Sequence, residues 1–262
     1  MALKEFWASI GRHKTRFIVS GSGRPVVLVH GLGGSLETWK NNFNFLSRHF
    51  KVYAFDMLGF GLADKPKIQY RIGVFTDFLE GFLDAISAEK VCLIGNSLGG
   101  LVSLWFAVHH QDRLEKLVVE SAAGLETGAR YVIMDFMGEW WTMESLKRFY
   151  QFVYYDPSKV SEEILELRLE MFSSPEAQHA YKSTLNMPRE WEILPEKLIS
   201  LERPTLIVWG AQDKLIPVKH AYQLHKLIKN SKLAVFKETG HIPHAEKPEK
   251  FNEMVTGFLK DP

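Results

Sequence analysis

Short runs rich in apolar residues recur along the chain and alternate with segments of helical spacing. Six of these runs have strand length, at 25–29, 51–55, 91–94, 114–119, 205–209 and 233–236. The run 25–29 is continuously apolar, as expected for a strand that is buried on both faces of a parallel sheet. Two earlier runs, 3–10 and 15–19, predict an antiparallel hairpin at a sheet edge. Helices are expected at 37–45, 71–87, 98–110, 217–228 and 248–259. The alternation predicts an α/β fold with a doubly wound, mostly parallel sheet of eight strands and helices on both faces.

The alternation stops between about residues 125 and 200. This stretch is rich in aromatic residues and methionine, has no strand-length β-branched run, and is expected to form several helices. We therefore predict a main domain formed by 1–124 and 201–262, with 125–200 as a helical insertion that folds over the ligand-binding edge of the sheet. About half of its aromatic side chains are expected to pack its own core, since burial is the default for such residues.

Composition excludes several classes of partner. The 262 residues include 32 Lys and Arg against 31 Asp and Glu, and no run of like charge suggests a nucleic acid or an anionic membrane. Cys92 is the only cysteine, so an intrachain disulfide is impossible and an oxidising compartment is not implied. Neither a signal-like apolar segment at the N-terminus nor a stretch of membrane-spanning length is present. We expect a cytoplasmic protein without stable membrane association; its oligomeric state is left open.

A candidate nucleophile lies at a strand–turn–helix junction. The run 91–94 leads into Gly-Asn-Ser-Leu-Gly at 95–99, and an apolar segment of helical length follows. This context gives meaning to a G-x-S-x-G pattern, because the sharp turn lifts the Ser97 hydroxyl above the sheet. The flanking glycines allow strand and helix to pass closely. The turn predicts that Ser97 is a nucleophile, although a glycine turn can also serve phosphate binding or packing alone.

Two later strand ends supply the partners that a serine nucleophile needs. A serine hydroxyl requires an adjacent base, and a histidine base requires a carboxylate that orients it. Asp213 follows the strand 205–209 and His241 follows the strand 233–236, which gives the order Ser, Asp, His. Asp56 is an alternative acid that more simply organises its own glycine-rich turn. Weaker acid candidates are Glu120 and Asp135, and structural hydrogen bonding is the better interpretation of the nearby histidines, His30 and His244.

No metal or cofactor is predicted. His241, His244 and Asp213 could be imagined as ligands, but neither an H-E-x-x-H motif nor a cysteine pair supports a metal site.

Five motifs occur in order along the chain: His-Gly-Leu-Gly-Gly at 30–34, Asp-x-x-Gly-x-Gly from 56, Gly-Asn-Ser-Leu-Gly-Gly at 95–100, Trp-Gly-Ala-Gln-Asp at 209–213 and Gly-His-Ile-Pro-His at 240–244. In these motifs the chain resembles the α/β-hydrolase fold family over nearly its whole length outside the insertion. The resemblance implies a helical cap at 125–200. It also implies an oxyanion hole formed by the backbone N–H groups of Leu32 and Leu98.

The serine nucleophile narrows the reaction. We expect hydrolysis of small carboxylic esters through an acyl-enzyme, with Ser97 as nucleophile, His241 as base and Asp213 as the orienting acid. An apolar acyl or aryl pocket is expected, with Trp140, Met137 and Ile242 as candidate lining residues.

Two other functions stay open. The Gly-Asn-Ser-Leu-Gly-Gly turn at 95–100 and the helical cap also resemble hydrolases that cleave carbon–carbon bonds of ring-fission dienoates. Those enzymes typically have Gly-Pro-Gly in the loop that corresponds to 30–34, and tryptophan directly after the catalytic histidine. Arginines of the cap, Arg148, Arg168 and Arg189, could then bind a substrate carboxylate. The other alternative is a ligand receptor that retains the hydrolase fold.

Overall fold

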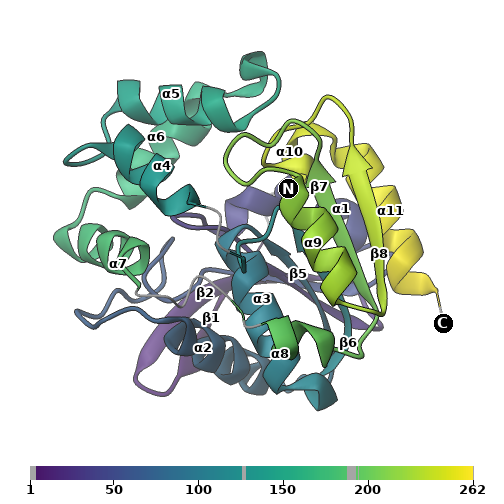
Figure 1. Ribbon diagram of the computed structural model, residues 1–262. Coiled ribbons are helices and arrows are strands. Elements are labelled where there is room, and N and C mark those ends of the chain that lie inside the picture. The colour runs from purple at the N-terminus through teal and green to yellow at the C-terminus, as the bar shows by residue number, and fades with distance from the viewer. Residues whose placement is uncertain (1–3, 126–127, 188–192, 194, 262) are drawn as a thin grey trace.

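A single sheet organises the computed structural model, which describes residues 4–125, 128–187, 193 and 195–261 (Figure 1). Its strand order is β1-β2-β4-β3-β5-β6-β7-β8. The strands are β1 (Glu5–Ile10), β2 (His13–Ser20), β3 (Pro25–Val29), β4 (Lys51–Phe55), β5 (Val91–Asn96), β6 (Leu114–Glu120), β7 (Thr205–Gly210) and β8 (Ser231–Phe236). β2 pairs antiparallel with β1 and β4, and the other neighbours are parallel. The predicted sheet and its edge hairpin are therefore confirmed.

Helices cover both faces of the sheet. One face carries α2 (Ile72–Ala85), α3 (Leu98–His109) and α9 (Lys219–Leu227), and their apolar side chains share one buried cluster with the sheet. A second buried cluster joins the opposite face to α1 (Phe43–Leu46) and α11 (Pro248–Lys260). β3, β5, β6 and β7 have almost no exposed residue, which explains why they appear in the sequence as apolar runs.

The region predicted as one helix at 37–45 is broken. A 3₁₀ turn, η1 (Leu36–Trp39), precedes the four-residue helix α1. Between them the buried amide of Asn42 donates to the carbonyl of His244 and to the side chain of Asn252. These bonds to a distant segment fix the chain at Asn42. Other differences are small: α9 begins two residues after Pro217, and a short helix, α10 (Pro243–Glu246), follows His241.

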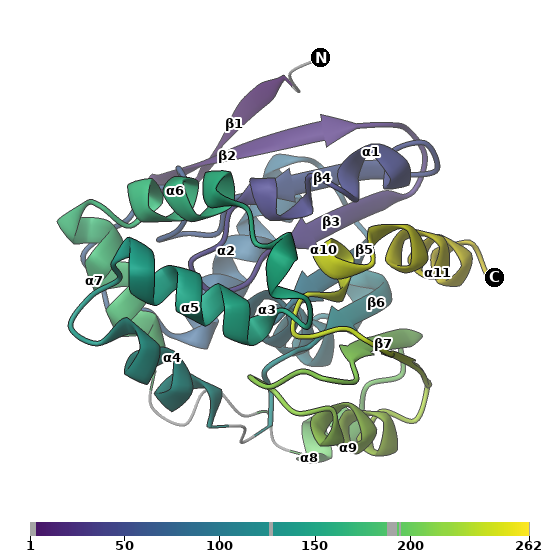
Figure 2. The ribbon, with the colours of Figure 1, turned by 90° about the horizontal axis from the view of Figure 1, so that it is seen from above.

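The described part of the predicted insertion is helical and contains no strand. Its helices are α4 (Ala129–Met137), α5 (Met143–Val153), η3 (Pro157–Lys159), α6 (Glu162–Met171), α7 (Pro175–Leu185) and α8 (Pro195–Ile199). Thr142, Ser161 and Ser174 cap α5, α6 and α7 through their hydroxyl groups. In both ribbon views α4 to α7 gather on the side of the molecule away from α11 (Figure 2). The division of the chain at 125 and 200 stays a prediction.

The strand order reverses beside β3. β4 lies on one side of β3 and β5 on the other, and β6, β7 and β8 follow outward from β5. Crevices at such a reversal, at the carboxyl ends of parallel strands, are where open α/β sheets bind ligands. The loop 30–34 after β3 and Ser97 after β5 therefore lie at the expected binding edge. Among the described residues, no helix is both long and apolar enough to cross a bilayer.

Candidate active site

Ser97 occupies a strained turn between β5 and α3. Its backbone has φ 54° and ψ −115°, a region that costs a non-glycine residue about 1–3 kcal/mol. The Ser97 N–H donates to the carbonyl of Glu120 at 2.9 Å, and its carbonyl accepts from the N–H of Leu101 at 3.0 Å. A side chain at Gly99 would collide with the backbone carbonyls at the end of β3. The turn therefore depends on the close approach of α3 to the end of β3 at Gly99.

His241 is bound to Asp213. The Nδ1 atom of His241 lies 2.8 Å from Oδ2 of Asp213, and both residues are 5% exposed. The other carboxylate oxygen of Asp213 accepts the N–H groups of Leu215 and Ile216 at 3.0 and 2.8 Å. Burial by itself lowers the pKa of His241, but the charge of Asp213 and their hydrogen bond outweigh it and raise the pKa above 6.5. Asp213 thus holds the imidazole with Nδ1 as the donor.

The two candidate oxyanion donors belong to segments next to Ser97. Leu98 is the first residue of α3, so its N–H has no partner within the helix. Leu32 lies in the loop after β3, and a Cβ atom on the adjacent Gly31 would lie 3.3 Å from the Cβ of Ser97. His30 shapes this loop: its Nδ1 donates to the Gly31 carbonyl and its Nε2 accepts the N–H of Met57. Burial lowers the pKa of His30 to about 3, so it is a neutral structural residue.

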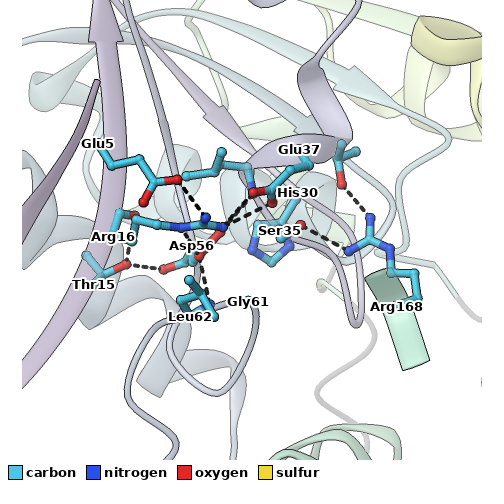
Figure 3. Close-up of polar contacts among 12 residues, drawn as sticks. Glu5, Thr15, Arg16, His30, Ser35, Glu37, Asp56, Gly61, Leu62 and Arg168 are labelled. Carbon is cyan, nitrogen blue, oxygen red and sulfur yellow. Dashed lines mark hydrogen bonds and ion pairs between the residues drawn. The ribbon is translucent and has the colours of Figure 1, made fainter. Parts of the chain in front are cut away.

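Asp56 organises its own turn. One of its oxygens accepts the N–H of Leu36, and the other accepts from Leu62 N–H at 2.8 Å and from the Arg16 guanidinium at 3.0 Å (Figure 3). Arg16 also contacts Glu5 and Glu37. The carboxylate is fully buried in these bonds. This is the structural role that the glycine-rich turn after β4 indicated.

Glu120 and His244 form a second buried pair. The Glu120 carboxylate accepts the backbone N–H of His244 at 2.5 Å and its Nδ1–H at 2.6 Å, and both side chains are fully buried. Glu120 therefore has its own histidine partner, whereas Asp213 binds His241. Asp135, the remaining alternative to Asp213 as the orienting acid, is an exposed residue of α4.

One cavity contains both Ser97 and His241. Its lining combines polar residues on the side of the 30–34 loop with apolar residues of α4, α5 and the segments after β7 and β8: Gly31, Leu32, Gly34, Thr38, Asn96, Ser97, Ile133, Phe149, Tyr150, Val153, Arg168, Tyr181, Leu215, His241 and Ile242. Of the three predicted pocket residues, Ile242 lies in this wall. Met137 is buried in the insertion core, and the Trp140 ring packs against Phe172 and Tyr181. Neither belongs to the lining among the described residues.

Arg168 projects from α6 into this cavity. The residue is 5% exposed. Among the described residues its side chain bonds only neutral groups: the Gly33 carbonyl at 2.9 Å and the hydroxyls of Ser35 at 3.3 Å, Thr38 at 2.8 Å and Tyr150 at 3.2 Å. Figure 3 shows Arg168 extending toward Ser35. Arg148 is exposed on α5, and Arg189 lies outside the described residues.

Several wall residues were missed by the sequence analysis. Thr38, Tyr150 and Tyr181 are polar or aromatic residues on turns and helices, and their place in the lining of the Ser97 cavity depends on tertiary packing. Of the lining residues that were missed, Leu215 and Asn96 could have been found from the sequence, because Leu215 lies two residues after Asp213 and Asn96 lies next to Ser97. No group of three or more His, Cys, Asp or Glu residues is arranged to hold a metal in the part of the chain that the structure describes.

Comparison with known proteins gives a consistent family. A sequence model described as alpha/beta hydrolase fold matches residues 24–143 and 144–248. The chain is 34% identical to a 2-hydroxy-6-oxo-2,4-heptadienoate hydrolase of Pseudomonas putida, over 91% of this chain and 90% of the relative. It is 32% identical to a 2-hydroxy-6-oxo-6-(2'-aminophenyl)hexa-2,4-dienoic acid hydrolase of Metapseudomonas resinovorans, over 98% and 91% of the two chains.

Solved structures agree. A meta-cleavage product hydrolase from Pseudomonas fluorescens superposes with a TM-score of 0.90 at 28% identity, covering 98% of this chain and 97% of that chain. A serine hydrolase involved in carbazole degradation superposes with a TM-score of 0.89 at 32% identity, covering 98% and 99%. Both likenesses extend through the insertion as well as the sheet.

Proposed function

Because the chain belongs to the α/β-hydrolase fold family, we propose that it hydrolyses a carbon–carbon bond of 2-hydroxy-6-oxo-2,4-dienoates. The main support is the environment of Arg168. This buried cation lines the Ser97 cavity and has only neutral partners among the described residues. A buried charge without a counter-ion suits a ligand that brings the opposite charge. The dienoates in the names of the relatives carry a carboxylate.

The hydrogen bonds of Arg168 leave capacity for an anion. A guanidinium has five N–H groups, and among the described residues four acceptors are within reach of this one. The hydroxyls of Thr38 and Tyr150 accept from Arg168, so their own protons are free to point into the cavity that they line. A substrate carboxylate at this position would accept one N–H and two O–H groups.

In this proposal Ser97, His241 and Asp213 form the catalytic triad. The Ser97 hydroxyl attacks the ketone carbon while His241 takes its proton, and Asp213 stabilises the imidazolium. The N–H groups of Leu32 and Leu98 would bind the oxyanion, an interaction whose loss typically costs on the order of 100-fold or more in rate. The apolar wall formed by Ile133, Phe149, Val153, Leu215 and Ile242 would accommodate the acyl part.

Cleavage of a carbon–carbon bond requires that the departing carbon keeps a stabilised electron pair. Moving the 2-hydroxyl proton of the dienoate to carbon 5 creates a 2-oxo group conjugated with the carbon 3–carbon 4 double bond. After attack by Ser97 at carbon 6, the carbon 5–carbon 6 bond breaks and its electrons move onto the 2-oxo oxygen. His241 returns the proton, and water then releases the carboxylic acid from Ser97. The products are that acid and a 2-hydroxydienoate.

Ester hydrolysis is the second candidate, because the same acyl transfer cleaves esters and the apolar wall fits an acyl chain. It gives Arg168 no role, and the relatives named above are dienoate hydrolases. For this reason it ranks below carbon–carbon bond hydrolysis. A receptor function gains no support from these relatives.

Turnover of both substrate types by the purified protein tests the proposal. We expect 2-hydroxy-6-oxohepta-2,4-dienoate or its 6-phenyl analogue to lose its absorbance with a kcat of about 10 per second, a usual value for enzymes. Chromatography should show equal amounts of the carboxylic acid and the 2-hydroxydienoate, and Ser97→Ala should abolish the formation of both products. Rapid hydrolysis of p-nitrophenyl esters with both dienoates intact would overturn the proposal in favour of the esterase.

A further inference from the structure

The backbone around His241 is held by one buried carboxylate and one helix end. Glu246, in α10, accepts the N–H of Gly240 at 2.8 Å and that of Ile242 at 3.4 Å through a single oxygen. The N–H of His241 itself donates to the carbonyl of Val153, the last residue of α5, at 2.7 Å. Three consecutive N–H groups, from 240 to 242, are therefore bound to Glu246 or to the end of α5.

The second oxygen of Glu246 reaches the insertion. It accepts the N–H of Tyr155, two residues beyond the end of α5, at 2.8 Å. Glu246 is 2% exposed, so these bonds are shielded from water. The approach of the two segments is close: a Cβ atom at Gly240 would collide with the carbonyl of Val153 and would lie 2.8 Å from the N–H of Tyr155. One carboxylate thus joins the His241 loop to the segment that follows α5.

The same helix also contacts the candidate carboxylate site. Tyr150 lies one helical turn before Val153 on α5, and its hydroxyl accepts from Nε of Arg168 at 3.2 Å. Tyr150 and Val153 both line the Ser97 cavity. Because a helical turn is rigid on this scale, an anion that fixes Arg168 and Tyr150 also fixes the α5 end that holds His241.

We infer that Glu246 is a positioning residue that couples the α5 end to His241, so that a substrate carboxylate bound at Arg168 helps to align the base. The inference rests on the proposed function for the identity of the anion. The coupling itself consists of bonds within this chain and does not depend on that identity. A productive base must lie within hydrogen-bond reach of the attacking hydroxyl, so a small displacement of His241 lowers the rate more than substrate binding.

Glu246 and its neighbours also set the charge around His241. Asp213 has the largest favourable effect on the imidazolium, and Glu120 and Glu246 add smaller ones. The Lys159 ammonium also lies beside Glu246 and donates to its main-chain carbonyl at 2.7 Å. Loss of charge and loss of position at Glu246 must therefore be separated by the choice of variants.

Two substitutions at Glu246 distinguish the loss of its charge from the loss of its position. Glu246→Gln removes the charge and turns an amide N–H₂ toward one of the backbone donors. Glu246→Asp keeps the charge but shortens the reach to Tyr155 and Gly240. The matched control is Glu249→Gln, the same change at an exposed position three residues later. Thermal unfolding verifies that each variant is folded, and Glu246→Asp still tests the coupling should Glu246→Gln fail to fold.

The expected result is a fall in kcat for the dienoate, with little change in KM, for both Glu246 variants. We expect a fall on the order of 10- to 100-fold, as for small misplacements of a catalytic group. The rate of fluorophosphonate labelling of Ser97, which needs no dienoate, should fall in parallel. In Glu246→Gln a charge that raises the pKa of His241 is lost, so the pH at which the labelling rate declines on the acid side should be lower. Glu249→Gln should match the wild type.

The outcomes distinguish the two proposals. Folded Glu246 variants with wild-type kcat and labelling, or with a change in KM alone, would overturn the coupling. A wild-type protein that does not cleave dienoates, while its Ser97 labelling still slows in both Glu246 variants, would overturn the proposed function and support the coupling.

Discussion

Replacement of Arg168 by methionine gives the sharpest test of the carboxylate site. Methionine keeps much of the length and apolar surface of the side chain but removes the charge and every N–H group. The substrate carboxylate would accept the one remaining N–H of Arg168, and a hydrogen bond to a charged group contributes about 1.5–3 kcal/mol. Since about 1.4 kcal/mol corresponds to a factor of ten, we expect kcat/KM for a dienoate to fall by about 10- to 100-fold.

The comparison substrate isolates the charge effect. p-Nitrophenyl acetate carries no carboxylate, so its hydrolysis should depend on Ser97 and His241 and much less on Arg168. Arg168→Met also leaves the Gly33 carbonyl and the Thr38 hydroxyl without their donor. Thermal unfolding must therefore be measured beside the kinetics, and the ratio of the two kcat/KM values is the deciding quantity.

A second arginine of the insertion provides the control. Arg148 is exposed on α5, so Arg148→Met removes the same charge from the same region without reaching the cavity. Arg148→Met should leave kcat/KM unchanged for both the dienoate and p-nitrophenyl acetate. An equal loss of dienoate and ester turnover in Arg168→Met, or no loss for the dienoate, would refute the assignment of Arg168 as the carboxylate ligand.

Two further predictions concern the buried acid–histidine pairs. Because Asp213 raises the pKa of His241 above 6.5 and the base must be neutral, kcat/KM should decline as the pH falls through a value above 6.5; Asp213→Asn should move that limb to lower pH and reduce kcat by about 10⁴-fold. A pH–rate profile with unchanged limbs would contradict this. Removal of one member of the buried Glu120–His244 pair by Glu120→Met should cost about 3–5 kcal/mol of unfolding free energy. Urea unfolding measures it, and an unaltered midpoint would speak against the pair.

The framework of the fold could be predicted because its signals are local. Strands such as β5 and β7 are buried on both faces and are therefore continuous apolar runs. The turn at Ser97 needs glycines at fixed offsets, and the order Ser97, Asp213, His241 places each candidate after its own strand. Each of these signals lies within a few residues of the side chain that it explains.

The parts that could not be predicted depend on contacts between distant segments. Arg168 was one of three candidate arginines, and only the packing of α6 against residues 33–38 distinguishes it from the exposed Arg148. The break at Asn42 depends on bonds to residues some 200 positions later. Glu246 gives no sequence signal, because its carboxylate binds backbone N–H groups, which every non-proline residue carries. The preference for esters rested on a missing proline and tryptophan near the site, whereas the relatives and Arg168 favour dienoates.

The central claim is that Ser97 is a nucleophile activated by His241. Labelling of the full-length protein with a fluorophosphonate, followed by mass spectrometry of its peptides, tests this claim directly. We predict one adduct, on Ser97, that forms quickly at neutral pH, slows sharply in His241→Ala and is suppressed by a dienoate substrate. An adduct on another residue, or the absence of any adduct on a folded protein, would contradict it.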